Sequence, residues 1–285
     1  MLTLPDLTGK TILITGATNG IGLEAAVALT KAGAAVHIVG RDPGRTEASA
    51  ATIESRGGRR PGTFLCDFSS QKAIRRLAPE VLAALPRIDV LVNNAGAVYD
   101  TRTLTEDGIE ATFAVNHLGY FLLTQLLLDR LVGSAPARIV NVASTGHYRG
   151  NLDFDDLGFE RGYAIMSAYC RSKLANVLFT RSLAKKLEGT GVTVNALHPG
   201  GVATNIWTGA PGWAKPFLSI AKWFMITPEQ GAETITFLAA MPEADGKTGG
   251  YYHKNKIVQP SELARDAALG DRLWAESERL VAASA

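Results

Sequence analysis

The stretch TGATNGIG, residues 15–22, places three glycines where a strand gives way to a helix. The preceding run, residues 11–14, is apolar and rich in β-branched residues, which predicts a buried strand. Apolar residues then recur at helical spacing up to Gly33. Glycine permits close approach to the backbone, and the first helical turn offers unpaired N–H groups. The junction predicts an anion site, usually for a phosphate, although a purely steric tight turn is the alternative.

Composition narrows the class of protein. The chain has 285 residues, 46% of them hydrophobic, so it can bury one large core. Its net charge of +2 is close to neutral, which makes nucleic acid a poor candidate partner. Only Cys66 and Cys170 are present, which favours a reducing compartment, the cytoplasm. Without a long uncharged apolar segment or a secretory signal, no stable membrane insertion is expected. The histidines lack metal-ligand spacing, so no metal site is expected.

Strand-like runs alternate with helical stretches along the chain. The strands are expected at 11–15, 35–40, 62–66, 89–93, 138–144, 192–197 and 249–253. The helices are expected at 21–32, 43–57, 70–84, 105–132, 164–188, 228–240 and 261–283. This alternation predicts an α/β fold, a doubly wound parallel sheet of about seven strands with helices on both faces, as a single domain over residues 1–285.

Polar or glycine-rich residues follow most of these strands, at the edge where open α/β sheets bind ligands. They are residues 16–22, Gly40-Arg41-Asp42, Asp67, Asn93-Asn94-Ala95-Gly96, Ser144 and His198-Pro199-Gly200. Any one of these could be an ordinary turn. Their common position at one edge predicts a shared site.

The segment AYCRSK places Tyr169 and Lys173 four residues apart, on one face of a predicted helix. A free phenol titrates near pH 10, and a neighbouring ammonium group stabilises its anion. A phenol tuned in this way suits proton transfer to a carbonyl oxygen. Taken alone, the pair is more simply explained as an aromatic–cation contact on a helix surface.

Together and in this order, TGATNGIG, NNAG, a serine after an apolar strand, Y-x-x-x-K and H-P-G resemble the short-chain dehydrogenase/reductase family. The resemblance runs from Thr11 to about His253, and it is closest to the retinol-dehydrogenase and WW-domain-oxidoreductase-like branch. It implies a Rossmann-type fold and an oxidoreductase that interconverts an apolar alcohol and its ketone or aldehyde by hydride transfer. A reductase of activated C=C bonds and a non-catalytic dinucleotide-binding sensor or scaffold are the alternatives.

The resemblance also implies roles for single residues. Tyr169 would be the acid–base group, and Lys173 would bind the nicotinamide ribose and lower the pKa of Tyr169. Ser144 would hydrogen-bond the substrate oxygen. Asn116 would hold a water in a proton relay behind Lys173, with a helix-interior amide bonded to backbone as the alternative. The expected substrate contacts are Ser144, His147, Tyr169 and Trp207.

The cofactor-binding residues implied by the resemblance lie in the glycine-rich turn, at the strand ends and in the loop after the sixth strand. They are Gly16, Thr18, Asn19, Gly20, Ile21, Gly22, Arg41, Asp67, Phe68, Asn94, Ala95, Gly96, Tyr169, Lys173, Pro199, Gly200, Val202 and Thr204.

The end of the second strand bears on the choice of nicotinamide cofactor. An NAD-selective enzyme carries Asp or Glu there, whereas this chain has Gly40 followed by Arg41. A guanidinium can bind a 2′-phosphate, so the sequence favours NADP(H), with NAD(H) as the alternative. Asp42 is expected to cap the next helix. An aspartate placed at Gly40 is expected to reverse the cofactor preference.

Residues 205–226 hold three of the four tryptophans and an amphipathic helical pattern. The family uses this segment as a lid over substrate, which implies an apolar ligand. A helix packed on the body or on a partner subunit and a membrane-surface helix are the alternatives. A homodimer or homotetramer is left open. The acidic stretch at 151–162 lacks the glycine and terminal acid of a calcium loop and is expected to be a solvated loop.

Overall fold

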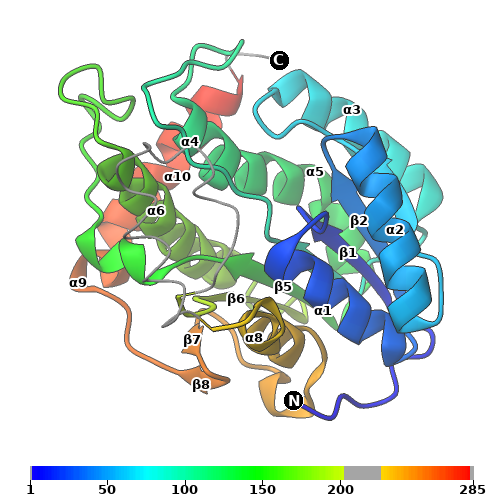
Figure 1. Cartoon of the computed structure of the whole chain (residues 1–285). Coiled ribbons are helices and arrows are strands. Elements are labelled where there is room, and N and C mark those ends of the chain that lie inside the picture. Colours follow the sequence, from blue (N-terminus) through cyan, green and yellow to red (C-terminus); the bar gives the residue numbers. More distant parts are fainter. Residues whose placement is uncertain (1, 202–225, 283–285) are drawn as a thin grey trace.

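One sheet of eight strands, in the order β3-β2-β1-β4-β5-β6-β7-β8, organises residues 2–201 and 226–282, which the computed structural model describes (Figure 1). The strands are β1 (Thr11–Thr15), β2 (Ala35–Gly40), β3 (Gly62–Leu65), β4 (Val90–Asn93), β5 (Ala137–Val142), β6 (Val192–Leu197), β7 (Tyr251–His253) and β8 (Lys256–Ile257). The α-helices are α1 (Gly20–Lys31), α2 (Pro43–Gly57), α3 (Gln71–Ala84), α4 (Ala111–Phe113), α5 (Gly119–Gly133), α6 (Ile165–Lys186), α8 (Pro228–Ala240), α9 (Glu262–Arg265) and α10 (Ala267–Ala282). Shorter helical turns are η1 (Ala114–Leu118), η2 (Thr145–Arg149) and η6 (Pro242–Ala244).

The pairing of the strands confirms the predicted doubly wound sheet. Strands β1 to β7 pair in parallel. Strands β2 and β3 extend the sheet on one side of β1, and β4 to β7 extend it on the other, so the switch point lies between β1 and β4. The eighth strand, β8, was not predicted and runs antiparallel to β7. The two are joined through Lys254 and Asn255, whose φ angles of 48° and 63° fit a two-residue hairpin turn.

Helices cover both faces of the sheet (Figure 1), and alternate residues of each strand pack on opposite layers. Ile12 and Ile14 of β1 face the layer that contains α1, α2 and α8. Leu13 faces the other layer, built from α3, α5 and α6, where it joins a cluster that includes Phe121 and Phe179. Both faces of β1 are therefore buried, as its continuous apolar sequence predicts.

The long helix expected at 105–132 begins six residues later than predicted, at Ala111. Gly108 adopts φ +73° in the preceding turn, and the buried Glu110 carboxylate accepts the N–H groups of Thr112 and Phe113, both at 2.8 Å. A side chain that satisfies the first free N–H groups fixes the start of a helix. The helix expected at 261–283 is split at Asp266, which caps α10 by accepting the Leu269 N–H at 3.0 Å.

The apolar side chains of α5 are packed in the hydrophobic core. The stretch Ala111–Gly133 is long and apolar enough to cross a membrane, and 83% of its most apolar window is buried inside the protein. From the chain's C-terminal part, α10 places Trp274 against Phe121 and Phe179, with ring centroids 5.0 and 6.0 Å away. The composition of this helix is thus explained by packing on the sheet and on α10.

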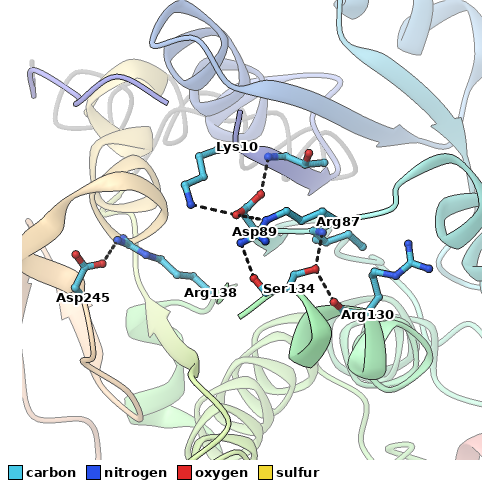
Figure 2. A network of polar contacts seen from close by, with 9 residues as sticks. Lys10, Arg87, Asp89, Arg130, Ser134, Arg138 and Asp245 are labelled. Carbon is cyan, nitrogen blue, oxygen red and sulfur yellow. Dashed lines mark hydrogen bonds and ion pairs between the residues drawn. The ribbon is translucent and has the colours of Figure 1, made fainter. Parts of the chain in front are cut away.

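A network of charged groups lies at the N-terminal edge of the sheet (Figure 2). Asp89, only 3% exposed, accepts hydrogen bonds from Thr11 N–H at 2.9 Å, Arg87 Nε at 2.8 Å and Lys10 Nζ at 3.2 Å. Burial alone would raise the pKa of Asp89, but these bonds outweigh it and hold that pKa below its usual value. The network joins the starts of β1 and β4.

Ser134 and Arg138 extend this network toward β5 and α8 (Figure 2). Arg87 Nη2 donates to the Ser134 carbonyl at 2.8 Å, and Ser134 Oγ accepts the Ile88 N–H at 3.0 Å. Arg138 donates to two carbonyls at the end of α8 and pairs with Asp245. The N-terminal edge is therefore closed by satisfied polar groups, and a cavity lies at the opposite edge.

Candidate active site

The glycine-rich turn after β1 is held against the turn after β4. Asn94 Nδ2 donates to the Thr15 and Gly16 carbonyls at 2.9 and 3.0 Å, and Thr15 Oγ1 accepts the N–H groups of Asn94 and Ala95. A Cβ at Gly16 would lie 2.6 Å from Ala95 Cα, and one at Gly22 would lie 2.4 Å from Asn94 Nδ2. Glycine is required at both positions because the two loops leave no room for a side chain.

The first turn of α1 keeps its N–H groups free of a side-chain cap. Asn19 occupies the N-cap position without making a side-chain hydrogen bond to the helix. Uncapped N–H groups at the positive end of a helix dipole form a binding site for anions. The close-packed glycines and the uncapped helix start therefore fit the predicted phosphate site.

A cavity of about 980 Å³ opens at the carboxyl ends of the strands. Its wall contains all the described residues predicted to bind a cofactor, from Gly16 in the first turn to Gly200 after β6. They are Gly16, Thr18, Asn19, Gly20, Ile21, Gly22, Arg41, Asp67, Phe68, Asn94, Ala95, Gly96, Tyr169, Lys173, Pro199 and Gly200. Ser144 lines the same cavity. The structure thus brings these side chains together, while their contacts with a cofactor stay predictions.

Two arginines stand at the β2 end of this cavity, Arg41 and Arg45. Neither forms an ion pair with a carboxylate within residues 2–201 and 226–282. The nearby Asp42 carboxylate instead caps α2 by accepting the Arg45 N–H at 2.7 Å, which confirms the predicted cap. The guanidinium groups are therefore available to an anionic ligand.

Gly40 has a packing role that the sequence did not reveal. A Cβ there would lie 2.1 Å from Thr46 Oγ1 and 2.6 Å from Thr18 Cγ2. The expected reversal of cofactor preference by an aspartate at Gly40 stays a prediction, and the structure adds a packing cost to it. Such a side chain would push apart α2 and the glycine-rich turn before it could contact a ribose.

Ser144 and Tyr169 meet on the cavity wall. Ser144 ends the extended segment after β5, and its Oγ accepts the Gly146 N–H at 3.1 Å at the start of η2. The Ser144 side chain lies close enough to the Tyr169 hydroxyl to lower its pKa. Burial raises the pKa of Tyr169 above its usual value of 10.0, and the Ser144 side chain offsets this effect only in part.

Lys173 lies close to Tyr169 but points to the backbone of β5. Its Nζ donates to the Val142 carbonyl at 3.0 Å and lies 5.7 Å from the centre of the Tyr169 ring. Burial lowers the pKa of Lys173 to about 8. In the polypeptide alone, burial raises the pKa of Tyr169, so the lowering of that pKa by Lys173 stays a prediction for the enzyme with bound cofactor.

Asn116 lies behind the cavity wall in η1, a π-helical turn between α4 and α5. Its Oδ1 accepts the Ala97 N–H at 2.8 Å, and its Nδ2 donates to the Ala97 carbonyl at 3.0 Å and to Ser172 Oγ at 3.1 Å. The backbone-bonded amide left open by the sequence is therefore present. A π-helical turn inside an α-helix often marks a functional site, because it redirects a side chain.

His147 does not reach the cavity, so its predicted substrate contact was wrong. The ring is fully buried, and both of its nitrogens are hydrogen-bonded to backbone. Val202, Thr204, Trp207 and the lid predicted near 205–226 lie outside the described residues, except for Ile226. The cofactor, substrate and lid assignments of those positions stay predictions.

Several residues of the cavity wall were not predicted from the sequence. Arg45 carries a recognisable signal, because it follows Arg41 by four residues in the first turn of a helix that Asp42 caps. Tyr99, Arg149 and Met166 carry none, since they come from a loop, the end of η2 and the start of α6, whose directions depend on tertiary packing. Tyr99, for example, is placed by the Tyr163 hydroxyl, which donates to its carbonyl at 2.8 Å.

One cavity is lined by a glycine-rich turn, a serine, a tyrosine and a lysine, as is expected of a dinucleotide-dependent oxidoreductase. Comparison with known proteins agrees with this class. The sequence pattern of the short chain dehydrogenase family matches residues 10–214. The chain belongs to this family and is an oxidoreductase that acts on CH–OH and C=O groups.

Its relatives include human retinol dehydrogenase 13, which is 42% identical over 96% of this chain and 85% of the relative. Human retinol dehydrogenase 14 is 43% identical over 96% of this chain and 86% of the relative. Among solved structures, an uncharacterised protein of Mycobacterium paratuberculosis has a TM-score of 0.80 and 32% identity, with 98% of this chain and 96% of that chain covered.

RhlG of Pseudomonas aeruginosa, solved as an NADP active-site complex, has a TM-score of 0.69 and 29% identity over 86% of this chain and 94% of that chain. These similarities confirm the predicted family and the Rossmann-type fold. They also show that NADP binds to proteins of this fold that resemble this chain.

Proposed function

We propose that this protein is an NADP(H)-dependent oxidoreductase that interconverts an apolar alcohol and its ketone or aldehyde. The observation that carries the proposal is a single cavity. Two arginines without carboxylate partners in the described chain lie at one end of this cavity, and the side chains of Ser144 and Tyr169 lie in the same wall. Neither feature alone specifies both the cofactor and the chemistry.

The residues of the cavity fit a dinucleotide with a 2′-phosphate. Gly16 and Gly22 let the glycine-rich turn pack closely on the Asn94–Ala95 loop, and the uncapped start of α1 offers N–H groups to a pyrophosphate. Arg41 and Arg45 would bind the 2′-phosphate through charge-assisted hydrogen bonds. When bound, the nicotinamide ring supplies or accepts a hydride.

The chain's own residues would handle the proton. The Tyr169 hydroxyl would donate a proton to the carbonyl oxygen during reduction, and the Ser144 hydroxyl would hydrogen-bond the same oxygen as charge develops on it. Because the pKa of Tyr169 lies above 10.0, this residue holds its proton at neutral pH.

Lys173 and Asn116 would support this step from behind the wall. A Cβ built at Gly96 would lie 3.3 Å from Asn116 Oδ1 and 4.0 Å from Lys173 Nζ, so both groups lie behind the same short loop. Lys173 would bind the ribose hydroxyls, and Asn116 would hold a water that returns protons to Lys173. Loss of both activity and cofactor affinity in Lys173→Met would support the ribose role, and unchanged affinity would exclude it.

The names of the relatives suggest the first substrates to test. Several are retinol dehydrogenases, so a long apolar alcohol such as retinol, and its aldehyde, are proposed as substrates of this chain. We further propose that the protein works in the cytoplasm, because both cysteines are buried and unpaired. Cell fractionation that recovers it in an oxidising compartment would contradict this location.

A substrate and cofactor screen tests the function. Purified protein is incubated with apolar ketones, aldehydes and alcohols, each with NADPH, NADP, NADH or NAD, and nicotinamide absorbance is followed. Turnover of an apolar carbonyl with NADPH at a higher kcat/KM than with NADH is expected. Turnover only of activated C=C compounds, or none with any pair, would contradict the proposal.

A further inference from the structure

His147 is buried directly beneath the loop that carries Ser144. Its Nδ1 lies 2.8 Å from the Ser144 carbonyl oxygen, and its backbone N–H donates to the same oxygen at 3.1 Å. Its Nε2 accepts the Ser261 N–H at 3.1 Å. One imidazole therefore connects the loop after β5 with a segment more than a hundred residues later.

The partners of His147 determine its protonation state. A carbonyl oxygen only accepts, so Nδ1 must carry the hydrogen, and a backbone N–H only donates, so Nε2 must carry a lone pair. The ring is thus the neutral Nδ1–H tautomer, with no capacity left for a substrate. The ring also packs against Tyr148 and Tyr251, with ring centroids 4.0 and 4.6 Å away.

A second bond ties the same two segments. The Tyr148 hydroxyl, next along the chain, donates to the Gln259 carbonyl at 2.6 Å. Residues 259–261 lead into α9, whose N-cap is Ser261. Two backbone groups of the C-terminal segment, the Gln259 carbonyl and the Ser261 N–H, therefore hold the helical turn η2 in place.

The bond from His147 Nδ1 acts on the peptide group of Ser144 itself. Ser144 is extended, with φ −164° and ψ 159°, and its carbonyl is the point where the chain bends into η2. Without the ring, this carbonyl would keep only the His147 N–H. Rotation of the Ser144 peptide would then move Oγ, which lies between the Gly146 N–H and the Tyr169 side chain.

We propose that His147 is a positioning residue for catalysis, which holds Ser144 in its reactive orientation by linking it to the Ser261 backbone. This role rests on the proposed function, because it requires Ser144 to contact the reacting oxygen. A contact with that oxygen strengthens as charge develops in the transition state. Loss of the link should therefore lower kcat, with little change in cofactor affinity.

The first test compares two replacements of the ring. His147→Phe keeps an aromatic ring between Tyr148 and Tyr251 but removes both hydrogen bonds, and we expect kcat to fall about ten- to hundredfold. His147→Gln keeps one donor and one acceptor and should recover a large part of that loss. KM for the carbonyl substrate and the NADPH Kd, measured by quenching of tryptophan fluorescence, should change little in both variants.

The second test breaks the same link from the other side and keeps the histidine. Ser261 has φ −56°, which proline can adopt, so Ser261→Pro removes the N–H donated to His147 Nε2, and the proline Cδ, which takes the place of that hydrogen, displaces the ring from its position. This change also removes the serine cap of α9, so Ser261→Ala, which removes only the cap, is the matched control. We expect Ser261→Pro to lower kcat as His147→Phe does, and Ser261→Ala to keep it near that of the wild type.

The outcomes separate the two proposals. A purely structural His147 would lower the Tm of His147→Phe but leave kcat of the folded enzyme unchanged, and Ser261→Pro would match Ser261→Ala. Either result, in a wild type that turns over its substrate, overturns the positioning role alone. If His147→Phe does not fold, the comparison of kcat between Ser261→Pro and Ser261→Ala tests the positioning role. A wild type without turnover on any nicotinamide–substrate pair overturns the proposed function instead.

Discussion

Charged side chains are paired with one another at one edge of the sheet and lack carboxylate partners at the other. At the N-terminal edge, the buried Asp89 is bonded by Thr11, Arg87 and Lys10 (Figure 2). At the carboxyl edge, Arg41 and Arg45 face the cavity without a carboxylate partner among the described residues. Groups paired within the chain stabilise the fold, while groups left unpaired keep their interaction energy for a ligand.

Substitutions at one edge should therefore change function, and substitutions at the other should change stability. The largest effect is expected from Tyr169→Phe, which removes the proposed proton donor. We expect kcat to fall roughly 10²- to 10⁴-fold, because general acid catalysis contributes about that much. NADPH affinity, measured by fluorescence quenching, should be retained.

Tyr252→Phe is the matched control for this variant. Its hydroxyl is buried in the core without a hydrogen-bond partner in the described structure, and it lies outside the cavity wall. Loss of this hydroxyl should leave kcat unchanged. A Tyr169→Phe enzyme that keeps more than about a tenth of the wild-type kcat would contradict the acid–base role.

A smaller functional effect is expected from Arg41→Ala. The variant loses charge-assisted hydrogen bonds to the 2′-phosphate, which contribute about 1.5–3 kcal/mol, so NADPH affinity should fall tenfold or more. NADH affinity should change little, because NADH lacks this phosphate. Arg45→Ala should likewise weaken NADPH binding more than NADH binding.

Titration of both cofactors into wild type and variants checks this prediction. Arg76→Ala on α3, where the arginine is 73% exposed and outside the cavity wall, should leave both affinities unchanged. A wild type that binds NADH as tightly as NADPH, or an Arg41→Ala protein that weakens both equally, would refute the preference for NADP(H).

The N-terminal edge predicts a stability effect of similar size. Asp89→Asn removes the charge that Lys10 and Arg87 bind and should lower the free energy of unfolding by about 1–3 kcal/mol. Asp245→Asn, whose carboxyl group is 67% exposed, should change it by less than about 1 kcal/mol. Urea unfolding measures both, and NADPH affinity should be unchanged in each.

The pH dependence sharpens this prediction. Because the folded pKa of Asp89 lies below its usual value of 3.8, its stabilisation is fully present above that value and is lost as the pH falls through the folded pKa. The wild type should therefore lose stability more steeply than Asp89→Asn on acidification below about pH 4. Parallel curves would show that Asp89 adds no pH-dependent stability.

The smallest effect is expected from Asp42→Ala, a carboxylate at the functional edge with a structural role. Loss of its bond to the Arg45 N–H should lower the free energy of unfolding by about 1 kcal/mol. NADPH affinity should not fall, because no contact with the phosphate is removed and a negative charge near it disappears. A clear loss of NADPH affinity would place Asp42 among the ligand-binding groups instead.

The sequence alone was sufficient for the order of the seven parallel strands and for the sheet edge at which the cavity lies, but not for β8. Strands such as β1 are buried on both faces, so their apolar runs are visible without coordinates, and TGATNGIG marks a turn that only glycine can form. Parallel strands end at one edge, so Ser144 and the loops after β1, β4 and β6 could be placed there together. The helix of Tyr169 and Lys173 followed from spacing.

Only the tertiary structure decided what each side chain does at that edge. The direction of Lys173 Nζ toward the Val142 carbonyl, the lack of space at Gly40 and the burial of His147 all depend on segments distant in the chain. Spacing within a helix or strand cannot report such contacts, because burial and hydrogen-bond partners come from long-range packing. For that reason the sequence identified His147 as a substrate contact, whereas the fold directs its ring nitrogens to the Ser144 carbonyl and the Ser261 N–H.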